Sequence, residues 1–346
     1  MEAKVTLETA RKKAELLAGG AVRIPSDFRL PFLASKSTAG PGAGSVGIVF
    51  SFGNTRAKKP ISRDEGEFEL IVDRGALSLR RNGKPFIDRV EILPTLLHAP
   101  YQAFVNIDHA CIMDCRFCAS PRLGRNMTKD LDDDKILAMI RDASQKDDFR
   151  SVAFTSAVTE SPAMTVKRMA GLVRETRAML PDVPIGVEPY ATRPDEVELL
   201  RDAGADEIKL NIESFDRDIF EKVCPKRDYD HILHAINHSG EVFGKNKVCS
   251  NIIFGLGESD ENVLEGTRVL ANMGAVATLR ALRRNEFNAR ELEDALGPLK
   301  PVTPGRMLDL ASEQKKIFLE YGLSPLRFRT MCHICLSCDL VPFWDV

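Results

Sequence analysis

Six of the eight cysteines of this 346-residue chain fall into two tight groups. The first triplet is Cys111, Cys115 and Cys118, and the second triplet is Cys332, Cys335 and Cys338. Disulfides are rare in a reducing cytosol, and cysteines two or three residues apart would close strained loops. Metal binding is therefore the better interpretation of both triplets.

The remaining cysteines and the histidines carry weaker signals. Cys224 and Cys249 stand alone, and lone cysteines are mostly small buried hydrophobic residues. The histidines show no ligand spacing beyond His231, His234 and His238, which recur at helical intervals of three and four. No pair of carboxylates accompanies them, so a helix face is the favoured interpretation.

The first triplet follows a predicted strand at 103–107, and α/β folds place their ligand-binding loops after strands. Three thiolates on one loop can hold three irons of a cubane cluster and leave the fourth iron open to a substrate. A structural zinc site usually takes four ligands in two pairs, and the only nearby histidine, His109, precedes the loop. A cluster is therefore favoured over zinc.

The composition excludes several classes of protein. Hydrophobic residues make up 44% and charged residues 28% of the chain, which is too apolar for a disordered protein. A formal charge of -2 provides no global basic field, so we predict neither nucleic acid nor a membrane as partner. No stretch approaches the ~20 apolar residues of a membrane helix, and the charged, amphipathic start is unlike a signal peptide. We predict a cytoplasmic protein.

The length predicts about two domains, or one large α/β unit with an extension. Residues 1–100 are predicted as a mixed N-terminal extension with a helix at 6–18. Turn signals between alternating runs predict an antiparallel meander with strands at 68–72, 76–80 and 86–92.

A Gly-rich stretch at 37–45 interrupts this extension. It lacks the Gly-Lys-Ser/Thr ending of a phosphate loop and the strand-to-helix setting. We interpret it as a tight loop that packs over a neighbouring site.

Residues 101–285 alternate strands with helices. Strands are predicted at 103–107, 151–156, 184–188, 207–212, 248–255 and 276–282, and helices include 131–146 and 164–180. Six βα units in series imply a parallel sheet, and apolar strands mean that both faces are covered or that the sheet curls into a barrel. Periodicity does not separate an incomplete barrel from an open sheet. Residues 286–346 hold a helix near 306–321 and the cysteine-rich tail.

The spacing C-x3-C-x2-C, with an aromatic residue before the last cysteine, resembles the signature of the radical S-adenosylmethionine (SAM) superfamily. The resemblance covers about 103–282 and implies an α/β fold, the partial (βα)6 TIM-like barrel of that family. It also implies that SAM chelates the open iron of a [4Fe-4S] cluster, and that the reduced cluster cleaves SAM to a 5'-deoxyadenosyl radical. A reductant such as ferredoxin or flavodoxin would supply the electron.

The resemblance assigns further residues to SAM. Phe117 would pack against the adenine, and Ile253 and Gly255 would line its other side. The backbone of Ser156 and Ala157, rather than Glu160, would contact the methionine amino group. Asn211 and Glu213 would contact the ribose, and Arg280 would pair with the methionine carboxylate. Structural alternatives stay open. Asn211 and Glu213 could cap a strand end, Gly255 could shape a turn, and Arg280 could form a salt bridge to a helix.

The second triplet lies after the barrel, preceded by Arg327 and Arg329. Arginines beside thiols favour deprotonation, and three close thiolates again favour an iron-sulfur cluster. A zinc knuckle that uses His333 is the alternative. With two [4Fe-4S] clusters, one could make the radical while the other ligates substrate, passes electrons or gives up a sulfide.

Four segments resemble lipoyl synthases: 155–158, 211–213, 225–229 and 255–258. This resemblance implies sulfur insertion into the unactivated C–H bonds of an octanoyl-lysine on a lipoyl carrier protein, with the second cluster as sulfur donor. Since the second triplet follows the barrel, the layout resembles a subunit of the two-protein archaeal-type lipoyl synthases, which implies a second radical SAM subunit. The alternatives are a biotin synthase-like or cofactor-maturation enzyme acting on a small molecule, and a zinc-binding module.

Overall fold

The computed structural model describes residues 5–32, 42, 45–122 and 131–346. The Gly-rich stretch at 37–45 falls almost entirely outside these residues, so its predicted role stays a prediction. Among the helices in the described ranges, none combines the length and the apolar character needed to cross a membrane.

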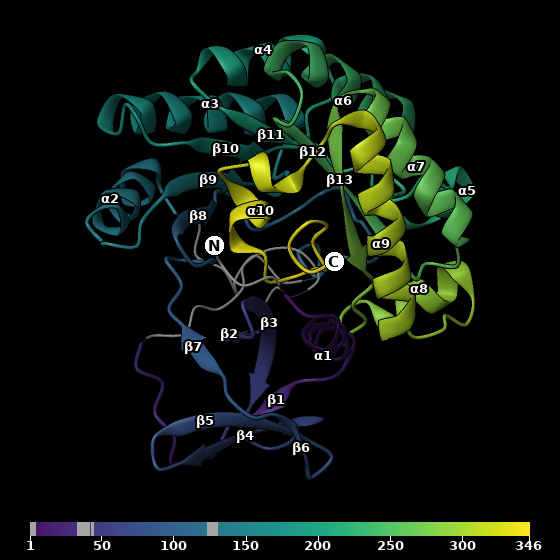
Figure 1. Cartoon of the computed structure of the whole chain (residues 1–346). Coiled ribbons are helices and arrows are strands. Elements are labelled where there is room, and N and C mark those ends of the chain that lie inside the picture. The colour runs from purple at the N-terminus through teal and green to yellow at the C-terminus, as the bar shows by residue number, and fades with distance from the viewer. Residues whose placement is uncertain (1–4, 33–41, 43–44, 123–130) are drawn as a thin grey trace.

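Six parallel strands form the centre of the molecule (Figure 1). They are β8 (Gln102–Asn106), β9 (Ser151–Thr155), β10 (Ile185–Glu188), β11 (Glu207–Lys209), β12 (Val248–Phe254) and β13 (Ala275–Ala281). They lie side by side in chain order, and each pairs in parallel with the next. The predicted fold class, an α/β partial barrel, is confirmed, and all six predicted strands are present. β11 ends at Lys209, three residues before the predicted limit, because the Ile212 N–H donates to the Ser250 hydroxyl and not to a backbone carbonyl of β12.

Helices cover the outer face of this curved sheet (Figure 1). They are α2 (Asp133–Ser144), α3 (Pro162–Met179), α4 (Pro194–Asp202), α5 (Arg217–Val223), α6 (Tyr229–Phe243), α7 (Asp260–Asn272), α8 (Ala289–Leu296) and α9 (Pro304–Tyr321). Several are capped by a side chain that accepts a hydrogen bond from the backbone N–H three residues later, as in Asp132, Ser161 and Ser259. These caps satisfy amides that no helical carbonyl can reach.

The N-terminal extension contains α1 (Leu7–Ala18) and a second sheet of seven strands. They are β1 (Val22–Arg23), β2 (Gly47–Phe52), β3 (Thr55–Ser62), β4 (Phe68–Asp73), β5 (Ala76–Arg81), β6 (Lys84–Ile87) and β7 (Glu91–Leu93), in the spatial order β6-β5-β4-β1-β3-β2-β7. The meander prediction is right for β4, β5 and β6. The predicted strand at 86–92 is wrong as one unit, because the chain leaves β5 after Ile87 and pairs as β7 with β2 instead.

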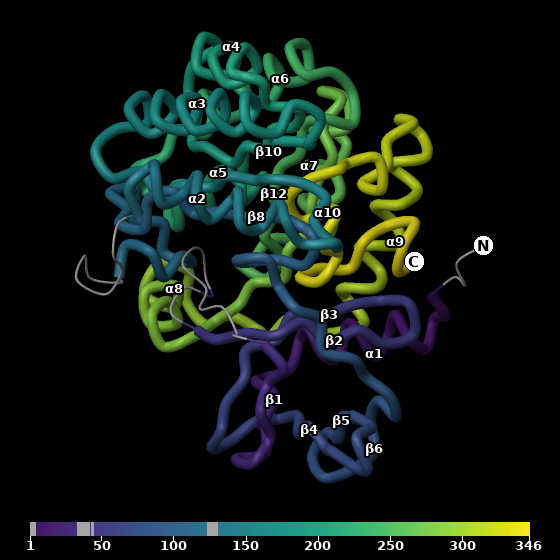
Figure 2. Tube along the Cα trace, turned by 90° about the vertical axis from the view of Figure 1, so that its left-hand side faces the viewer, coloured from purple at the N-terminus to yellow at the C-terminus, as the bar shows by residue number. Residues whose placement is uncertain are grey.

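The C-terminal tail, residues 328–346, covers the barrel opening at the amino ends of the strands. It follows the short turn η2 (Pro325–Arg327) and contains α10 (Met331–Cys335). The side-chain amide of Gln102, at the start of β8, bonds to the backbone nitrogen and oxygen of Met331 at 2.8 and 2.7 Å. A Cβ on Gly186 would lie 2.2 Å from Oγ1 of Thr330, so the approach of the tail requires a glycine there. Figures 1 and 2 show α10 inside the curve of the sheet.

The two ends of the chain meet in a buried ion pair. Nζ of Lys13 in α1 lies 2.6 Å from Asp345, and both side chains are fully buried. Asp345 also accepts a hydrogen bond of 2.5 Å from Thr55 at the start of β3. The N-terminal extension is therefore held against the tail by charge as well as by apolar packing.

Removing Lys13 is expected to be costly because it leaves the carboxylate of Asp345 buried without its cation. We expect Lys13→Met to lower the free energy of unfolding by about 3–5 kcal/mol, measured by urea denaturation. Adding Asp345→Asn should recover part of this loss, since the amide is neutral and still accepts from Thr55. The control is Lys12→Met, whose exposed pair with Glu8 should change stability by about 0–1 kcal/mol. No recovery in the double variant would contradict the prediction.

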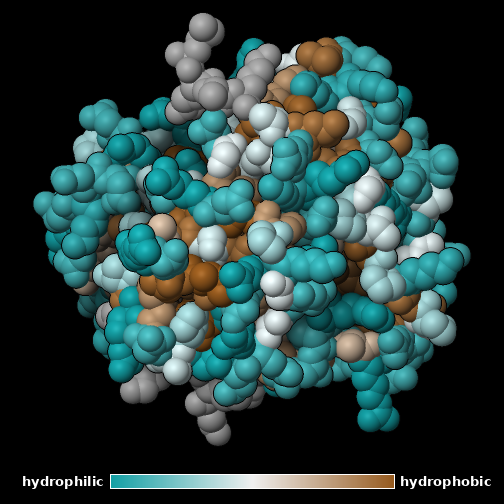
Figure 3. All heavy atoms as spheres, turned by 60° about the horizontal axis from the view of Figure 1, so that its bottom comes forward, coloured by the Kyte–Doolittle hydropathy of each residue, from teal (hydrophilic) through white to brown (hydrophobic). Residues whose placement is uncertain are grey.

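The surface on the side of the N-terminal extension is mostly hydrophilic (Figure 3). Apolar atoms gather in a few small patches between hydrophilic side chains. Among the described residues, the exposed apolar side chains include Leu7 and Val72. Scattered apolar residues of this kind are normal on protein surfaces, so we assign no docking surface here.

Candidate active site

The loop of the first triplet is fixed at the carboxyl ends of the barrel strands. It follows β8, and its Ile112 N–H donates to the carbonyl of Val158, beyond β9, at 2.8 Å. The Arg116 N–H donates to Val223 at the end of α5, also at 2.8 Å. Asp114 takes a positive φ of 57°, which turns the chain back between two of the cysteines. The loop therefore presents its thiols at the barrel mouth.

All three cysteines of the loop are free thiols. Burial raises the pKa of Cys111 and raises that of Cys118 to about 11. The hydrogen bond from the Cys224 thiol lowers the pKa of Cys115, and the nearby Arg227 guanidinium adds to this effect. Within the described residues, no three His, Cys, Asp or Glu side chains are gathered as the ligands of a single metal ion. The chemistry that fits three separate thiols on one loop is a cubane, whose irons take one thiolate each.

Cys224 has a role that the sequence did not reveal. It is buried, as predicted for a lone cysteine, but its thiol donates a hydrogen bond to the sulfur of Cys115 in the first triplet. The two are far apart in the sequence, and no local spacing could have paired them. Cys224 thus belongs to the surroundings of the candidate cluster.

A buried arginine that sequence reasoning missed lies beside the first triplet. The Arg227 side chain is 8% exposed, and its Nη1 lies 3.2 Å from Glu213. Its Nη2 donates to the Asn211 carbonyl, and its guanidinium stacks on the Tyr190 ring with 4.9 Å to the centroid. Its Nε is buried without a hydrogen-bond partner among the described residues. The free Nε–H of Arg227 could therefore donate a hydrogen bond to an anionic group of a ligand bound at the barrel mouth.

Asn211 and Glu213 are brought together with this arginine at the carboxyl end of β11. Asn211 donates to Glu188 at 2.8 Å and accepts from the Asn251 N–H at 3.1 Å. Burial raises the pKa of Glu213, and the charge of Arg227 opposes that rise. Both residues therefore link neighbouring strands, and their predicted ribose contacts stay predictions.

The other predicted SAM contacts lie around the same mouth. Phe117 is buried, and its carbonyl accepts from Asn288 at 2.8 Å. The Ser156 hydroxyl donates to the carbonyl of Ala157, whose own N–H donates to the carbonyl of Asp108. These interactions fix the segment after β9, and the contact with SAM stays a prediction.

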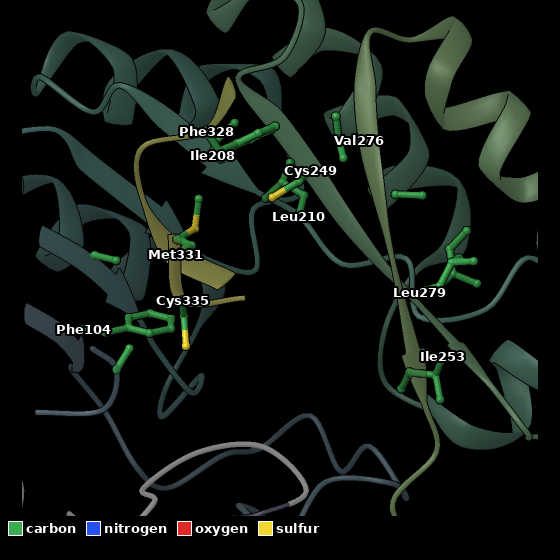
Figure 4. Packing of buried hydrophobic residues seen from close by; sticks show 14 of the residues in the cluster. Phe104, Ile208, Leu210, Cys249, Ile253, Val276, Leu279, Phe328, Met331 and Cys335 are labelled. Carbon is green, nitrogen blue, oxygen red and sulfur yellow. The ribbon is translucent and has the colours of Figure 1, made fainter. Parts of the chain in front are cut away.

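Ile253 and Gly255 lie at the end of β12. Ile253 is buried in the core (Figure 4). The Gly255 N–H donates to Glu258 at 2.7 Å, its φ is 103°, and a Cβ there would lie 2.5 Å from Val302. The glycine is therefore required by the turn, whatever it contributes to the adenine site.

Arg280 lies on β13 and is directed to the second triplet in this structure. Its Nη2 is 2.9 Å from Asp339 of the tail and 3.4 Å from Sγ of Cys332. It therefore forms a salt bridge, the alternative interpretation, but to the tail and not to a helix. Its predicted contact with the SAM carboxylate stays a prediction.

The second triplet lies on and just after α10, inside the barrel. Figure 4 shows Cys335 close to Phe104 of β8 and to Met331. Lys209 of β11 lies 3.6 Å from Sγ of Cys332. Burial raises the pKa of Cys335 to about 12, a cost that binding of the thiolate to a metal would offset.

The surroundings of the second triplet bear on two sequence-based expectations. The ring of His333 stacks on Phe328 at 4.5 Å and approaches the hydroxyl of Thr278 at 3.4 Å, and burial lowers its pKa to about 3. The ring also lines the same cavity as Cys332 and Cys338, so the zinc knuckle stays an alternative that metal analysis tests. Arg327 and Arg329 are exposed, and the cations near the thiols come from other elements.

Comparison with known proteins relates the barrel segment to one superfamily. Residues 105–268 match the model of the Radical SAM superfamily. This part of the chain is therefore a radical SAM domain. The chain is related to two kinds of curated protein. It is 30% identical to the biotin synthase of Psychrobacter sp. over 172 residues, 47% of this chain and 44% of that protein. It is 27% identical to the lipoyl synthase of Glaesserella parasuis over 175 residues, 49% and 53% of the two chains.

The chain spans about half the length of the curated relatives it matches. Solved structures agree on the fold. Methylornithine synthase aligns with a TM-score of 0.50 at 17% identity, covering 65% of this chain and 70% of the other. The FeFe-hydrogenase maturase of Carboxydothermus hydrogenoformans aligns with a TM-score of 0.51 at 16% identity, covering 68% and 57%.

Proposed function

We propose that this protein is a radical SAM enzyme whose first triplet holds a [4Fe-4S] cluster. The observation that carries the proposal is the three-thiol loop at the barrel mouth, facing the buried Arg227 with its unused Nε–H. When bound, the cluster would supply one electron to SAM and yield a 5'-deoxyadenosyl radical. The residues around it would orient SAM and exclude water.

We assign the SAM carboxylate to Arg227 in place of Arg280, because Arg280 is paired with Asp339 of the tail. Glu213 and the Asn211 carbonyl hold two of its nitrogens, so the guanidinium is fixed before any ligand arrives. A fixed, buried, charge-assisted donor binds a carboxylate more strongly than one that must be ordered first.

An Arg227→Lys variant should bind SAM less tightly, because lysine keeps the charge but loses the planar fork. We expect the KM for SAM to rise about 10- to 100-fold, the range for loss of one hydrogen bond between charged groups. The measurement is 5'-deoxyadenosine release against SAM concentration under dithionite. Arg217→Lys, at an exposed pair with Asp230, is the control and should leave the KM unchanged. An unaltered KM in Arg227→Lys would remove this residue from the SAM site.

For the reaction itself we propose sulfur insertion at an unactivated C–H bond, with the second cluster as sulfur donor. The similarity to biotin synthases and lipoyl synthases supports this proposal, and so does the second triplet inside the barrel. The proposed substrate is an octanoyl-lysine on a lipoyl carrier protein, with a second radical SAM subunit as partner and ferredoxin or flavodoxin as reductant.

A second candidate function is cofactor maturation or a biotin synthase-like reaction on a small molecule. It would use the second cluster only to anchor the substrate. The polar residues Glu188, Asn251 and Thr278 along the barrel interior favour it, because they could bind a small polar compound.

Metal analysis after anaerobic reconstitution tests the proposal. We expect about four irons and four acid-labile sulfides per triplet, and 5'-deoxyadenosine once SAM and dithionite are added. Stoichiometric zinc in place of iron would overturn the proposal in favour of a zinc-binding module. Release of sulfide from the second cluster into product would separate sulfur insertion from anchoring.

A further inference from the structure

The second triplet lies among charged side chains from three separate parts of the chain. Lys209 comes from β11 and Arg280 from β13, and both approach Sγ of Cys332, at 3.6 and 3.4 Å. Two charged donors therefore lie within reach of one sulfur atom. The Nε of Arg280 and the Oδ1 of Asp339 are buried beside it without hydrogen-bond partners among the described residues. Polar atoms left unsatisfied at such a place are consistent with a site for a further group.

The third cation comes from the N-terminal extension. Lys58 of β3 is 8% exposed, and its backbone N–H donates to the carbonyl of Ser337 at 2.7 Å. Ser337 lies between Cys335 and Cys338, so this bond joins β3 directly to the cysteine segment. The Lys58 ammonium donates to the carbonyl of His98 at 2.8 Å and lies within electrostatic reach of all three thiols.

Charge balance distinguishes Lys58 from the other two cations. Lys209 is paired with Glu188 at 3.0 Å, and Arg280 with Asp339 at 2.9 Å. Among the ion pairs of the described residues, Lys58 has no carboxylate partner. Burial lowers the pKa of Lys58, and the neighbouring cysteines oppose that effect. A buried ammonium without a counter-charge is costly, so an anion beside it would stabilise the fold.

We propose that the N-terminal extension is part of the second cluster site, and that Lys58 is the counter-charge of an anionic iron-sulfur centre held by the second triplet. This inference rests on the proposed function, since it needs a cluster at that triplet. A doubly positive [4Fe-4S] core with three thiolates carries one net negative charge, which a single ammonium balances. Lys58 is a positioning residue in this account, because it acts on the cluster through charge and through its bond to Ser337.

The structure also supplies a matched control on the same strand. Lys59 is likewise buried, but its ammonium donates to the carbonyl of Gly19 at 2.6 Å and lies over Phe68. It faces the interior of the N-terminal extension, whereas Lys58 faces the tail. Loss of a buried lysine from β3 can therefore be compared at two adjacent positions with different neighbours.

The test uses the full chain with the first triplet replaced by alanines, so that only the second cluster contributes to the spectrum. The reduction potential of the reconstituted cluster is followed by electron paramagnetic resonance. In this background Lys58→Met should shift the potential to more negative values, because loss of a nearby positive charge disfavours addition of an electron. Lys58→Arg should restore the potential, and Lys59→Met should leave it unchanged.

Iron analysis of the same samples separates the possible failures. Bound iron with an unchanged potential in Lys58→Met, or an equal shift in Lys59→Met, would overturn the role of Lys58 alone. Absence of iron at the second triplet would overturn both this inference and the sulfur-donor part of the proposed function. If Lys58→Met fails to fold, Lys58→Gln takes its place, since the neutral amide can still donate to the His98 carbonyl and should show the same negative shift.

Discussion

A Cys115→Ala variant is expected to lose all reductive cleavage of SAM, down to the level of a protein-free control. Cys115 is the most enclosed thiol of the first triplet, held between Cys224 and Arg227. Without it, the loop would offer two thiolates instead of three, and a cubane bound by two thiolates is not expected to persist. The measurement is 5'-deoxyadenosine released under dithionite, together with iron content.

The control for this variant is Cys249→Ala. Cys249 lies on β12 in the same barrel and is equally free and buried, but it belongs to neither triplet. It should keep both iron and SAM cleavage. If Cys115→Ala still released 5'-deoxyadenosine at the parent rate, the first triplet would not be the radical-generating site.

The predictable parts of this fold are those whose residues follow a recognisable pattern within a short stretch of sequence. The six barrel strands are buried apolar runs with turn signals at their ends, and the cysteine loop follows the first of them at a spacing found in the sequence. The hairpin of β2 and β3 was missed although Gly53 and Asn54, both at positive φ, form a recognisable turn.

The missed site residues share a different cause. Cys224, Arg227 and Lys58 lie next to the two triplets only because separate elements meet in space. No periodicity or spacing in one sequence encodes such contacts. The direction of Arg280 toward Asp339 depends in the same way on the tail, whose return into the barrel has no local signal beyond the cysteines themselves.

The same tail explains why the two triplets can be tested separately. The first lies at the carboxyl ends of the strands, and the second enters from the amino ends, where Gln102 and Glu207 bind the backbone of the tail. The N-terminal extension covers the tail through Lys13 and Lys58. The two sets of thiols therefore lie on separate segments and can be substituted one at a time, and Lys209, Glu188 and Asn211 connect the two sites through the barrel interior.

Cys335→Ala is accordingly expected to abolish sulfur transfer while SAM cleavage stays measurable. Cys335 is buried in α10, and its carbonyl accepts a hydrogen bond from the Ser337 hydroxyl. Its loss would remove one of the three thiolates of the sulfur donor. The measurement is the ratio of thiolated product to 5'-deoxyadenosine, which should fall to zero in the variant.

Cys249→Ala is a stringent control here, because Cys249 lies within electrostatic reach of Cys332 without belonging to the triplet. It should keep the parent ratio of product to 5'-deoxyadenosine. Loss of SAM cleavage together with thiolation in Cys335→Ala would mean that the two sites are not independent. Retention of thiolation would mean that the second triplet is not the sulfur donor, since a cluster with only two of its thiolates has no means of surviving to deliver sulfide.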